Sequence, residues 1–127
     1  PVFLDGENAG GLVQGQDLAL DALDNVPARL LLEDACAQAG VSIVHGAIRG
    51  WSAQVAVVPP GSGRLRRLYG SGGGAPIDRT SLPFTPPFCA AIQAAEAVKL
   101  LLGRPSSLEG QLLLADLRRM DWDLLPL

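Results

Sequence analysis

The chain has 127 residues, a formal net charge of −3, 48% hydrophobic residues and 18% charged residues. This length allows one domain with a real core, and the lack of a basic excess argues against a nucleic-acid partner. No apolar run reaches the roughly 20 residues that a membrane span needs, no signal peptide is recognisable, and the two cysteines lack closely spaced partners. We therefore expect one cytoplasmic domain, residues 1–127, without membrane contact. Because the chain begins at Pro1 rather than methionine, we expect a processed or cloned piece.

The first segment, residues 1–16, is predicted to be an irregular, glycine-rich lead-in. Its Gly10-Gly11 pair lacks the spacing of a phosphate-binding loop. The alternating residues 17–23 predict a strand, and residues 26–39 predict a helix. Asp24 and Asn25 supply N-cap chemistry for that helix, Pro27 suits its first turn, and glycine 40 ends it.

The β-branched residues 41–48 predict a buried parallel strand, which completes a βαβ unit with the preceding strand and helix. The link to the next predicted strand, 52–58, is too short for a crossover, so that strand is expected to run antiparallel. Residues 63–83 are predicted to be a long irregular loop. Its three arginines, at positions 64, 66 and 67, either meet an acidic partner or stay solvated.

A second long helix is predicted from residue 85 or 86 to 102, where Gly103 and Pro105 end it. Glu96 and Lys99 are expected to pair on its surface. Residues 110–117 form a further predicted strand, and 122–125 a last short one. The fold class is therefore α/β, with helices packed on a mixed sheet that begins parallel and ends antiparallel.

Asp24 and Asn25 lie where the carboxyl end of a parallel strand meets a helix N-terminus, which is the usual ligand crevice of open α/β sheets. From the residues alone, Asp24 either caps the helix or contacts a ligand. Asn25 either caps the helix or contacts a ligand as well. Arg29, one turn into the helix, is out of place for the helix dipole, so it either pairs with Glu33 four residues on or contacts a phosphate or a buried carboxylate.

Four stretches carry a resemblance to a known family: DLALDALDNVPAR at 17–29, VHGAIRGWSAQV at 44–55, AAIQAAEAVKLLLG at 90–103 and LLLADL at 112–117. In order and spacing they resemble the C-terminal half of the ThiF/MoeB/HesA family, bacterial relatives of the ubiquitin-activating enzymes. The resemblance implies a Rossmann-like sheet that binds ATP and Mg²⁺. It also implies conversion of the C-terminal Gly-Gly carboxylate of a ubiquitin-like sulfur-carrier protein into an acyl-adenylate, and a homodimer.

Carried over by position, Asp24 resembles the family's aspartate beside the ATP phosphates and Mg²⁺, and so is the catalytic, cofactor-binding and metal-binding candidate. Asn25 and Arg29 are further cofactor-binding candidates. The loop 63–83 is expected to cover or guide the incoming carrier tail.

The sequence also departs from the family pattern. The family's opening half, with its glycine-rich turn and phosphate-gripping arginine and lysine, has no counterpart, and the Cys-x-x-Cys pairs of zinc-containing members are absent, so no zinc site is expected. The loop 63–83 has no cysteine; Cys36 and Cys89 are expected to be packing residues, and His45 a hydrogen-bonded residue of the core or rim. The alternative hypothesis is therefore a non-catalytic dimerisation or protein-interaction module. A nicotinamide-dependent Rossmann enzyme is disfavoured, since its glycine fingerprint is missing.

Overall fold

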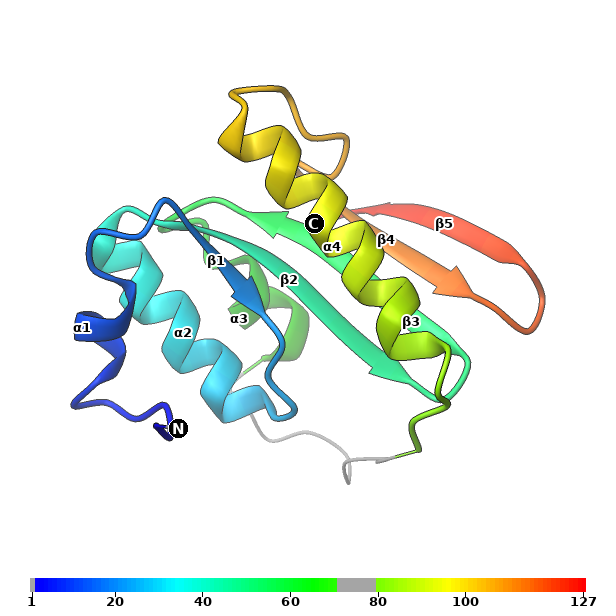
Figure 1. Ribbon diagram of the computed structural model, residues 1–127, viewed down its shortest axis with the longest axis horizontal. Helices are drawn as coiled ribbons and strands as arrows, with labels where there is room; N and C mark the ends of the chain where they lie inside the picture. The colour runs from blue at the N-terminus through cyan, green and yellow to red at the C-terminus, as the bar shows by residue number, and fades with distance from the viewer. Residues whose placement is uncertain (1, 71–79) are drawn as a thin grey trace.

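The computed structural model describes residues 2–70 and 80–127. Five strands form one sheet in the order β1-β2-β3-β4-β5 (Figure 1). The strands are β1 (Leu18–Asp21), β2 (Ser42–Arg49), β3 (Ser52–Val58), β4 (Gln111–Asp116) and β5 (Asp121–Pro126). The helices are α1 (Ala9–Val13), α2 (Val26–Ala39), α3 (Arg64–Tyr69) and α4 (Thr85–Leu101). β1 and β2 are parallel and every later pairing is antiparallel, which confirms the predicted fold class.

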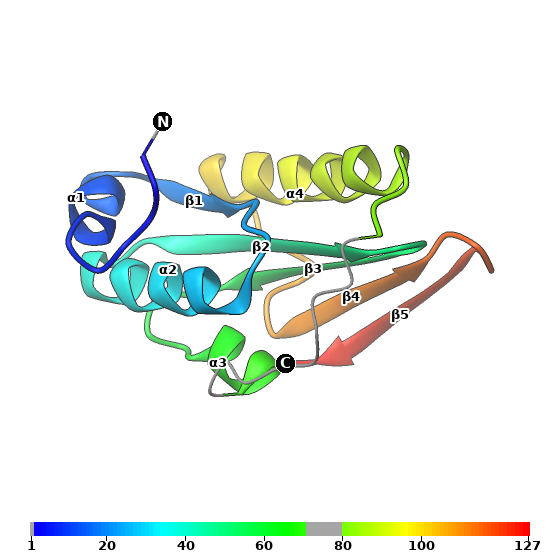
Figure 2. The same cartoon turned by 90° about the horizontal axis from the view of Figure 1, so that it is seen from below.

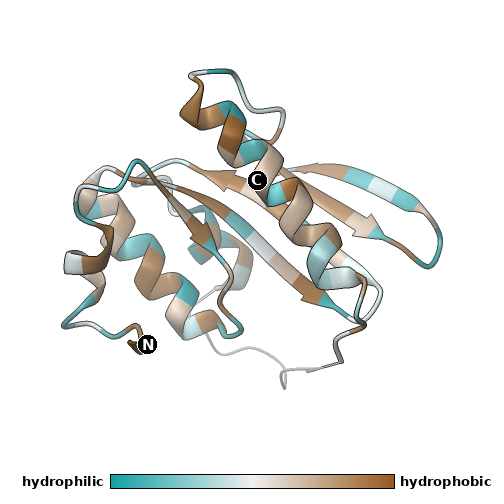
Figure 3. Ribbon diagram, in the orientation of Figure 1, coloured by the Kyte–Doolittle hydropathy of each residue, from teal (hydrophilic) through white to brown (hydrophobic). Residues whose placement is uncertain are grey.

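Helices cover both faces of the sheet: α4 lies on one face, and α2 and α3 lie on the other (Figure 2). Successive residues of β2 pack on opposite faces of the sheet because side chains alternate along a strand. Ile43 packs in the α1–α2–α3 core, whereas Val44 packs in the core beneath α4. This two-sided burial explains the continuous apolar sequence of β2. β5, by contrast, is exposed along its whole length and has mixed hydropathy (Figure 3).

The β1–α2 junction is built by local capping. The side-chain oxygen of Asn25 accepts a hydrogen bond from the Ala28 amide at 2.9 Å, which satisfies one of the orphan N–H groups of the first turn. Pro27 lies in that turn, and Gly40 ends α2 in the left-handed conformation at φ 72°. Asn25 is therefore the N-cap, and Asp24 is not.

The prediction that residues 1–16 are irregular was wrong, because α1 lies within them. The Asp5 carboxylate accepts hydrogen bonds from the amides of Glu7 and Asn8, each at 2.9 Å, and so starts the helix. Ala9 and Val13, four residues apart, are buried in the α1–α2–α3 core. Tertiary burial stabilises a helix that its glycines disfavour.

The prediction that 63–83 is wholly irregular was also wrong, since α3 occupies residues 64–69. Its first turn is capped from another helix: the Glu33 carboxylate of α2 accepts the amides of Leu65 at 2.8 Å and Arg66 at 3.0 Å. Arg66 also forms an ion pair with Asp34, in which its Nη2 donates to both carboxylate oxygens at 2.8 Å. The arginine-rich stretch thus meets an acidic partner within the chain. The glycine run of this loop falls largely in 71–79, outside the described residues.

The polar positions of α4 face inward, contrary to the expected surface pair. Lys99 does pair with Glu96, but the Glu96 carboxylate is buried and also accepts a hydrogen bond from Ser106 at 2.6 Å. The outward positions of the helix are apolar instead; the exposed ones are Pro87, Ala90, Ala91, Ala94, Ala95, Val98 and Leu101.

Candidate functional site

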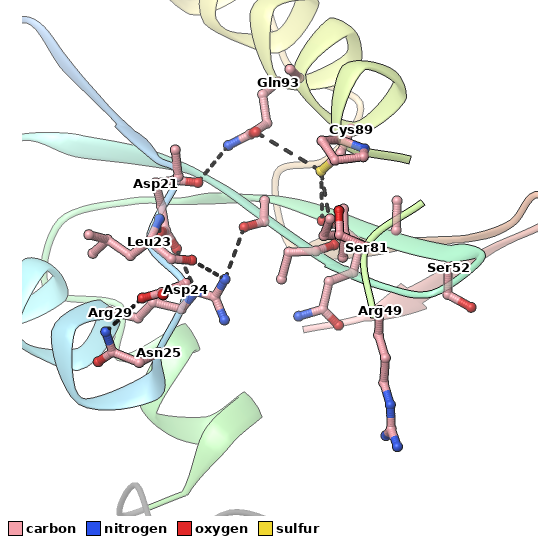
Figure 4. A pocket seen from close by; sticks show the side chains of 18 of the residues that line it. Asp21, Leu23, Asp24, Asn25, Arg29, Arg49, Ser52, Ser81, Cys89 and Gln93 are labelled. Atoms are coloured by element: carbon pink, nitrogen blue, oxygen red, sulfur yellow. Dashed lines mark hydrogen bonds and ion pairs between the residues drawn. The ribbon is translucent and has the colours of Figure 1, made fainter. Parts of the chain in front are cut away.

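A pocket of about 810 Å³ opens where the parallel strands β1 and β2 end. It is lined by the turn after β1, the start of α2, the facing parts of β2 and β3, the end of α3 and the first turns of α4 (Figure 4). The carboxyl ends of parallel strands are where open α/β sheets bind ligands. Asp24, Asn25 and Arg29, the three predicted site residues, all line this pocket.

Asp24 and Asn25 differ in their roles at the start of α2. Asn25 uses its side-chain oxygen for the cap and donates its amide N–H to the Asp24 carboxylate at 3.0 Å. Asp24 is exposed at the pocket, next to the N-terminus of α2, where the helix dipole favours negative charge. The structure thus leaves the Asp24 carboxylate at the pocket surface and gives the capping task to its neighbour.

Arg29 points toward the protein rather than toward solvent. Its guanidinium donates to the carbonyl of Leu23, and its Nε lies 3.3 Å from Oδ2 of Asp21. Of the partners considered for Arg29, the structure contains the buried carboxylate, while Glu33 caps α3 instead. This contact braces the turn that carries Asp24.

Sequence reasoning missed Asp21, which lines the pocket although its side chain is completely buried. The β1–β2 register pairs it with His45, and His45 Nδ1 lies 2.6 Å from its Oδ2. Its other oxygen accepts the Leu23 amide at 2.9 Å. A useful signal was available: a strand-end aspartate and the single histidine occupy matching positions in two strands predicted to be parallel. His45 itself is fully buried and hydrogen-bonded, as predicted.

Gln93 of α4 closes the pocket from the other face of the sheet. Its amide donates to the carbonyls of Asp21 at 2.9 Å and Val44 at 3.0 Å, at the end of the β1–β2 ladder. The space it needs exists because residue 46 is glycine; a Cβ there would lie 2.3 Å from the Gln93 side chain. Sequence reasoning did not identify this contact.

Cys89 lies beside Gln93 and is a packing residue, as predicted. It is buried, with its sulfur 3.7 Å from the carbonyl oxygen of Gln54. Burial raises its pKa from 9.0 to about 11, and does the same for Cys36. Such thiols are poor nucleophiles at neutral pH.

The donor set at the pocket suits one kind of metal. Among residues 2–70 and 80–127, no group of three histidine, cysteine or acidic side chains could hold an ion. The exposed Asp24 carboxylate has the oxygen donors that a hard cation such as Mg²⁺ prefers, with the remaining ligands to come from a bound phosphate group and water. In the described part of the chain, no helix is both long and apolar enough to cross a bilayer.

The fold and the pocket together place the protein in the class of open, mixed α/β sheets with a ligand crevice at the β1–α2 turn. The family follows from comparison: the model of the ThiF family matches residues 1–127, and the chain belongs to that family.

Named relatives include the SAMP-activating enzyme E1 of Haloferax volcanii, 36% identical over 97% of this chain and 47% of the relative. The sulfur carrier protein adenylyltransferase of Thermus thermophilus is 37% identical over 91% of this chain and 47% of its own length. The chain thus spans about half the length of these curated relatives.

Solved structures support the fold alone. A structure titled "Crystal Structure of SeMet PaaA" superposes with a TM-score of 0.69 at 14% identity, over 96% of this chain and 46% of that one. A heterocyclase in complex with substrate and cofactor gives a TM-score of 0.68 at 15% identity, over 96% of this chain and 21% of that one.

Proposed function

We propose that this chain is part of an ATP-dependent adenylyltransferase that activates the C-terminal Gly-Gly carboxylate of a ubiquitin-like sulfur-carrier protein. The observation that carries the proposal is the Asp24 carboxylate, exposed in the pocket where β1 meets α2. Support comes from the two relatives named as activating or adenylylating enzymes. We place the protein in the cytoplasm, where such carriers would meet it.

In this proposal the carrier's terminal carboxylate oxygen attacks the α-phosphorus of ATP, and pyrophosphate leaves. Asp24 would hold Mg²⁺, which supplies charge neutralisation between the phosphates and the incoming carboxylate. Asn25 fixes the Asp24 carboxylate by its 3.0 Å hydrogen bond and is the second cofactor-site residue. Arg29 supports the same cofactor site by bracing Leu23.

We further propose that the chain corresponds to the C-terminal half of the adenylation domain. The coverage of 47% of each of the two relatives agrees with this assignment. In the described residues, Arg29 and Arg49 are the only cations that line the pocket. Charge-assisted bonds to phosphate contribute about 1.5–3 kcal/mol each, so we expect further phosphate contacts from another part of the protein.

The experiment is carrier-dependent ATP–pyrophosphate exchange with the protein at its full encoded length. A ubiquitin-like protein ending in Gly-Gly is compared with the same protein lacking its last glycine. We expect exchange with the first and none with the second, because only the first has a tail long enough to bring its terminal carboxylate to the nucleotide. Equal exchange with both, or none with either, would contradict the proposal.

The alternative is a non-catalytic dimerisation or protein-interaction module, and the apolar outer face of α4 favours it. Val98 and Leu101 are 55% and 59% exposed on that face. A surface of this kind is typical of an interface. A folded protein that associates but shows no carrier-dependent exchange would favour this alternative.

A further inference from the structure

The residue before Asp24 is held at both of its backbone polar groups. The Leu23 N–H donates to Oδ1 of Asp21 at 2.9 Å, and the Leu23 carbonyl accepts from the Arg29 guanidinium. Since Asp24 follows directly, Asp21 and Arg29 set the direction in which its backbone leaves β1. Both residues line the inner wall of the pocket, where Asp21 is fully buried and Arg29 is 9% exposed (Figure 4).

Asp21 is itself held by a chain of buried hydrogen bonds. His45 Nδ1 lies 2.6 Å from Asp21 Oδ2, and both side chains are fully buried. When Nδ1 donates to the carboxylate, Nε2 is left as an acceptor, and the Tyr69 hydroxyl lies 3.0 Å from it. The pKa of Tyr69 is raised by burial, so its hydroxyl keeps the proton that this bond requires.

Tyr69 touches the second support of the turn as well. Its ring lies 5.5 Å from the Arg29 guanidinium carbon, within the range of a cation–π contact. The Gln54 amide donates to the Tyr69 oxygen and fixes the hydroxyl from a third side. Tyr69 therefore contacts Arg29 directly and is linked to Asp21 through His45.

The position of Tyr69 is determined from α2. Glu33 accepts the first amides of α3, and Asp34 pairs with Arg66, so the two acidic residues of α2 hold the helix that ends at Tyr69. Glu33 is buried, which makes its cap the stronger of the two attachments.

We propose that Tyr69 is a positioning residue for adenylation: through its hydroxyl on His45 and its ring on Arg29, it fixes the Asp21–Leu23 turn and thereby the Asp24 carboxylate. This inference rests on the proposed function of Asp24. It assigns a task to the segment between β3 and α4 other than covering the site. A Tyr69 that merely filled the core would stabilise the fold without affecting the turn.

The test compares Tyr69→Phe with Arg67→Gln, an exposed position on the same helix, in the protein at its full encoded length. Tyr69→Phe removes the hydroxyl and keeps the ring. We expect kcat of carrier-dependent exchange to fall about tenfold, because a misplaced group that acts in the transition state lowers the rate of the bound complex. KM for ATP should change by less than about twofold, and Arg67→Gln should match the wild type.

Hydrogen–deuterium exchange of the peptide covering residues 18–25, measured without ATP, gives a second readout. The inference predicts faster amide exchange there in Tyr69→Phe than in Arg67→Gln. Unchanged amide exchange would overturn it, as would an unchanged kcat or a rise in KM alone. If the wild type shows no carrier-dependent exchange, the proposed function is wrong. The hydrogen–deuterium exchange alone then decides whether Tyr69 holds the turn.

Discussion

At the scale of single residues, two aspartates close in sequence differ in solvent exposure. Asp21 is fully buried with three partners, while Asp24, three residues on, is exposed at the pocket. The sequence motif indicated Asp24 and Asn25 but could not tell cap from ligand residue, because both side chains suit an N-cap. Geometry separates them: Asn25 makes the bond to Ala28.

The buried thiols give a residue-scale prediction on pH. Burial in the folded state raises the pKa of Cys36 and Cys89 from 9.0 to about 11. The folded state therefore binds more protons between these values, and the free energy of unfolding falls as pH rises from 9 to 11. Each thiol should contribute roughly 2 kcal/mol of this loss, at about 1.4 kcal/mol per pKa unit.

Urea unfolding near pH 8 and again between pH 10 and 11 measures this difference. The matched control is the double variant Cys36→Ala/Cys89→Ala, in which the other titrating groups are unchanged. The variant should lose less stability on going to the higher pH. An equal loss in both proteins would show that the thiols do not titrate with unfolding.

At the scale of secondary-structure elements, the sequence predicted what local chemistry determines. β1, α2 and β2 follow from alternation, an N-cap, a first-turn proline and a terminal glycine. α1 and α3 were missed because their stabilisation is tertiary: α1 buries Ala9 and Val13, and α3 receives its cap from Glu33, more than 30 residues away in sequence. The register that joins Asp21 to His45 likewise depends on pairing between strands.

The contact between β2 and α4 gives an element-scale prediction. In Gly46→Ala, the new Cβ would lie 2.3 Å from Gln93 Cδ, so the Gln93 amide must leave the carbonyls of Asp21 and Val44. We expect a loss of about 2 kcal/mol in the free energy of unfolding, since buried carbonyls are left without a donor.

Chemical denaturation of Gly46→Ala and of Gly11→Ala measures the effect. A Cβ at position 11, within α1, meets no atom within 4 Å, and alanine is the better helix former there. Gly11→Ala should therefore be neutral or slightly stabilising. If Gly46→Ala were equally harmless, Gln93 would not be packed as described.

At the scale of the whole molecule, both faces of the inner sheet are covered, yet apolar surface is still exposed. The outer face of α4 carries no charged residue among its exposed positions from 90 to 98, and β1 exposes Leu20 at 56% at the edge of the sheet. The resemblance implied a homodimer, but the face that forms it could not be predicted from the sequence. Glu96 and Lys99 were expected on the helix surface, whereas Glu96 is buried and the exposed face of α4 is apolar.

This surface predicts self-association, as the proposed homodimer requires. Analytical ultracentrifugation should show dimer, and Val98→Glu should shift the protein toward monomer by placing charge on the apolar face. Leu12→Glu is the matched control, because Leu12 is also exposed, at 48%, but lies on α1. A monodisperse monomer for the wild type, or an equal shift with Leu12→Glu, would contradict the assignment of the α4 face.

The most direct test of the account is the effect of Asp24→Asn on Mg²⁺-dependent ATP–pyrophosphate exchange. The substitution keeps the shape of the side chain and removes its charge, while Asp17→Asn changes an exposed carboxylate at the opposite end of β1. The account predicts a loss on the order of 100-fold for Asp24→Asn, as for removal of an electrostatic group that acts in the transition state, and wild-type exchange for Asp17→Asn. Exchange by Asp24→Asn at the wild-type rate would show that the carboxylate at the β1–α2 turn is not the metal and phosphate residue.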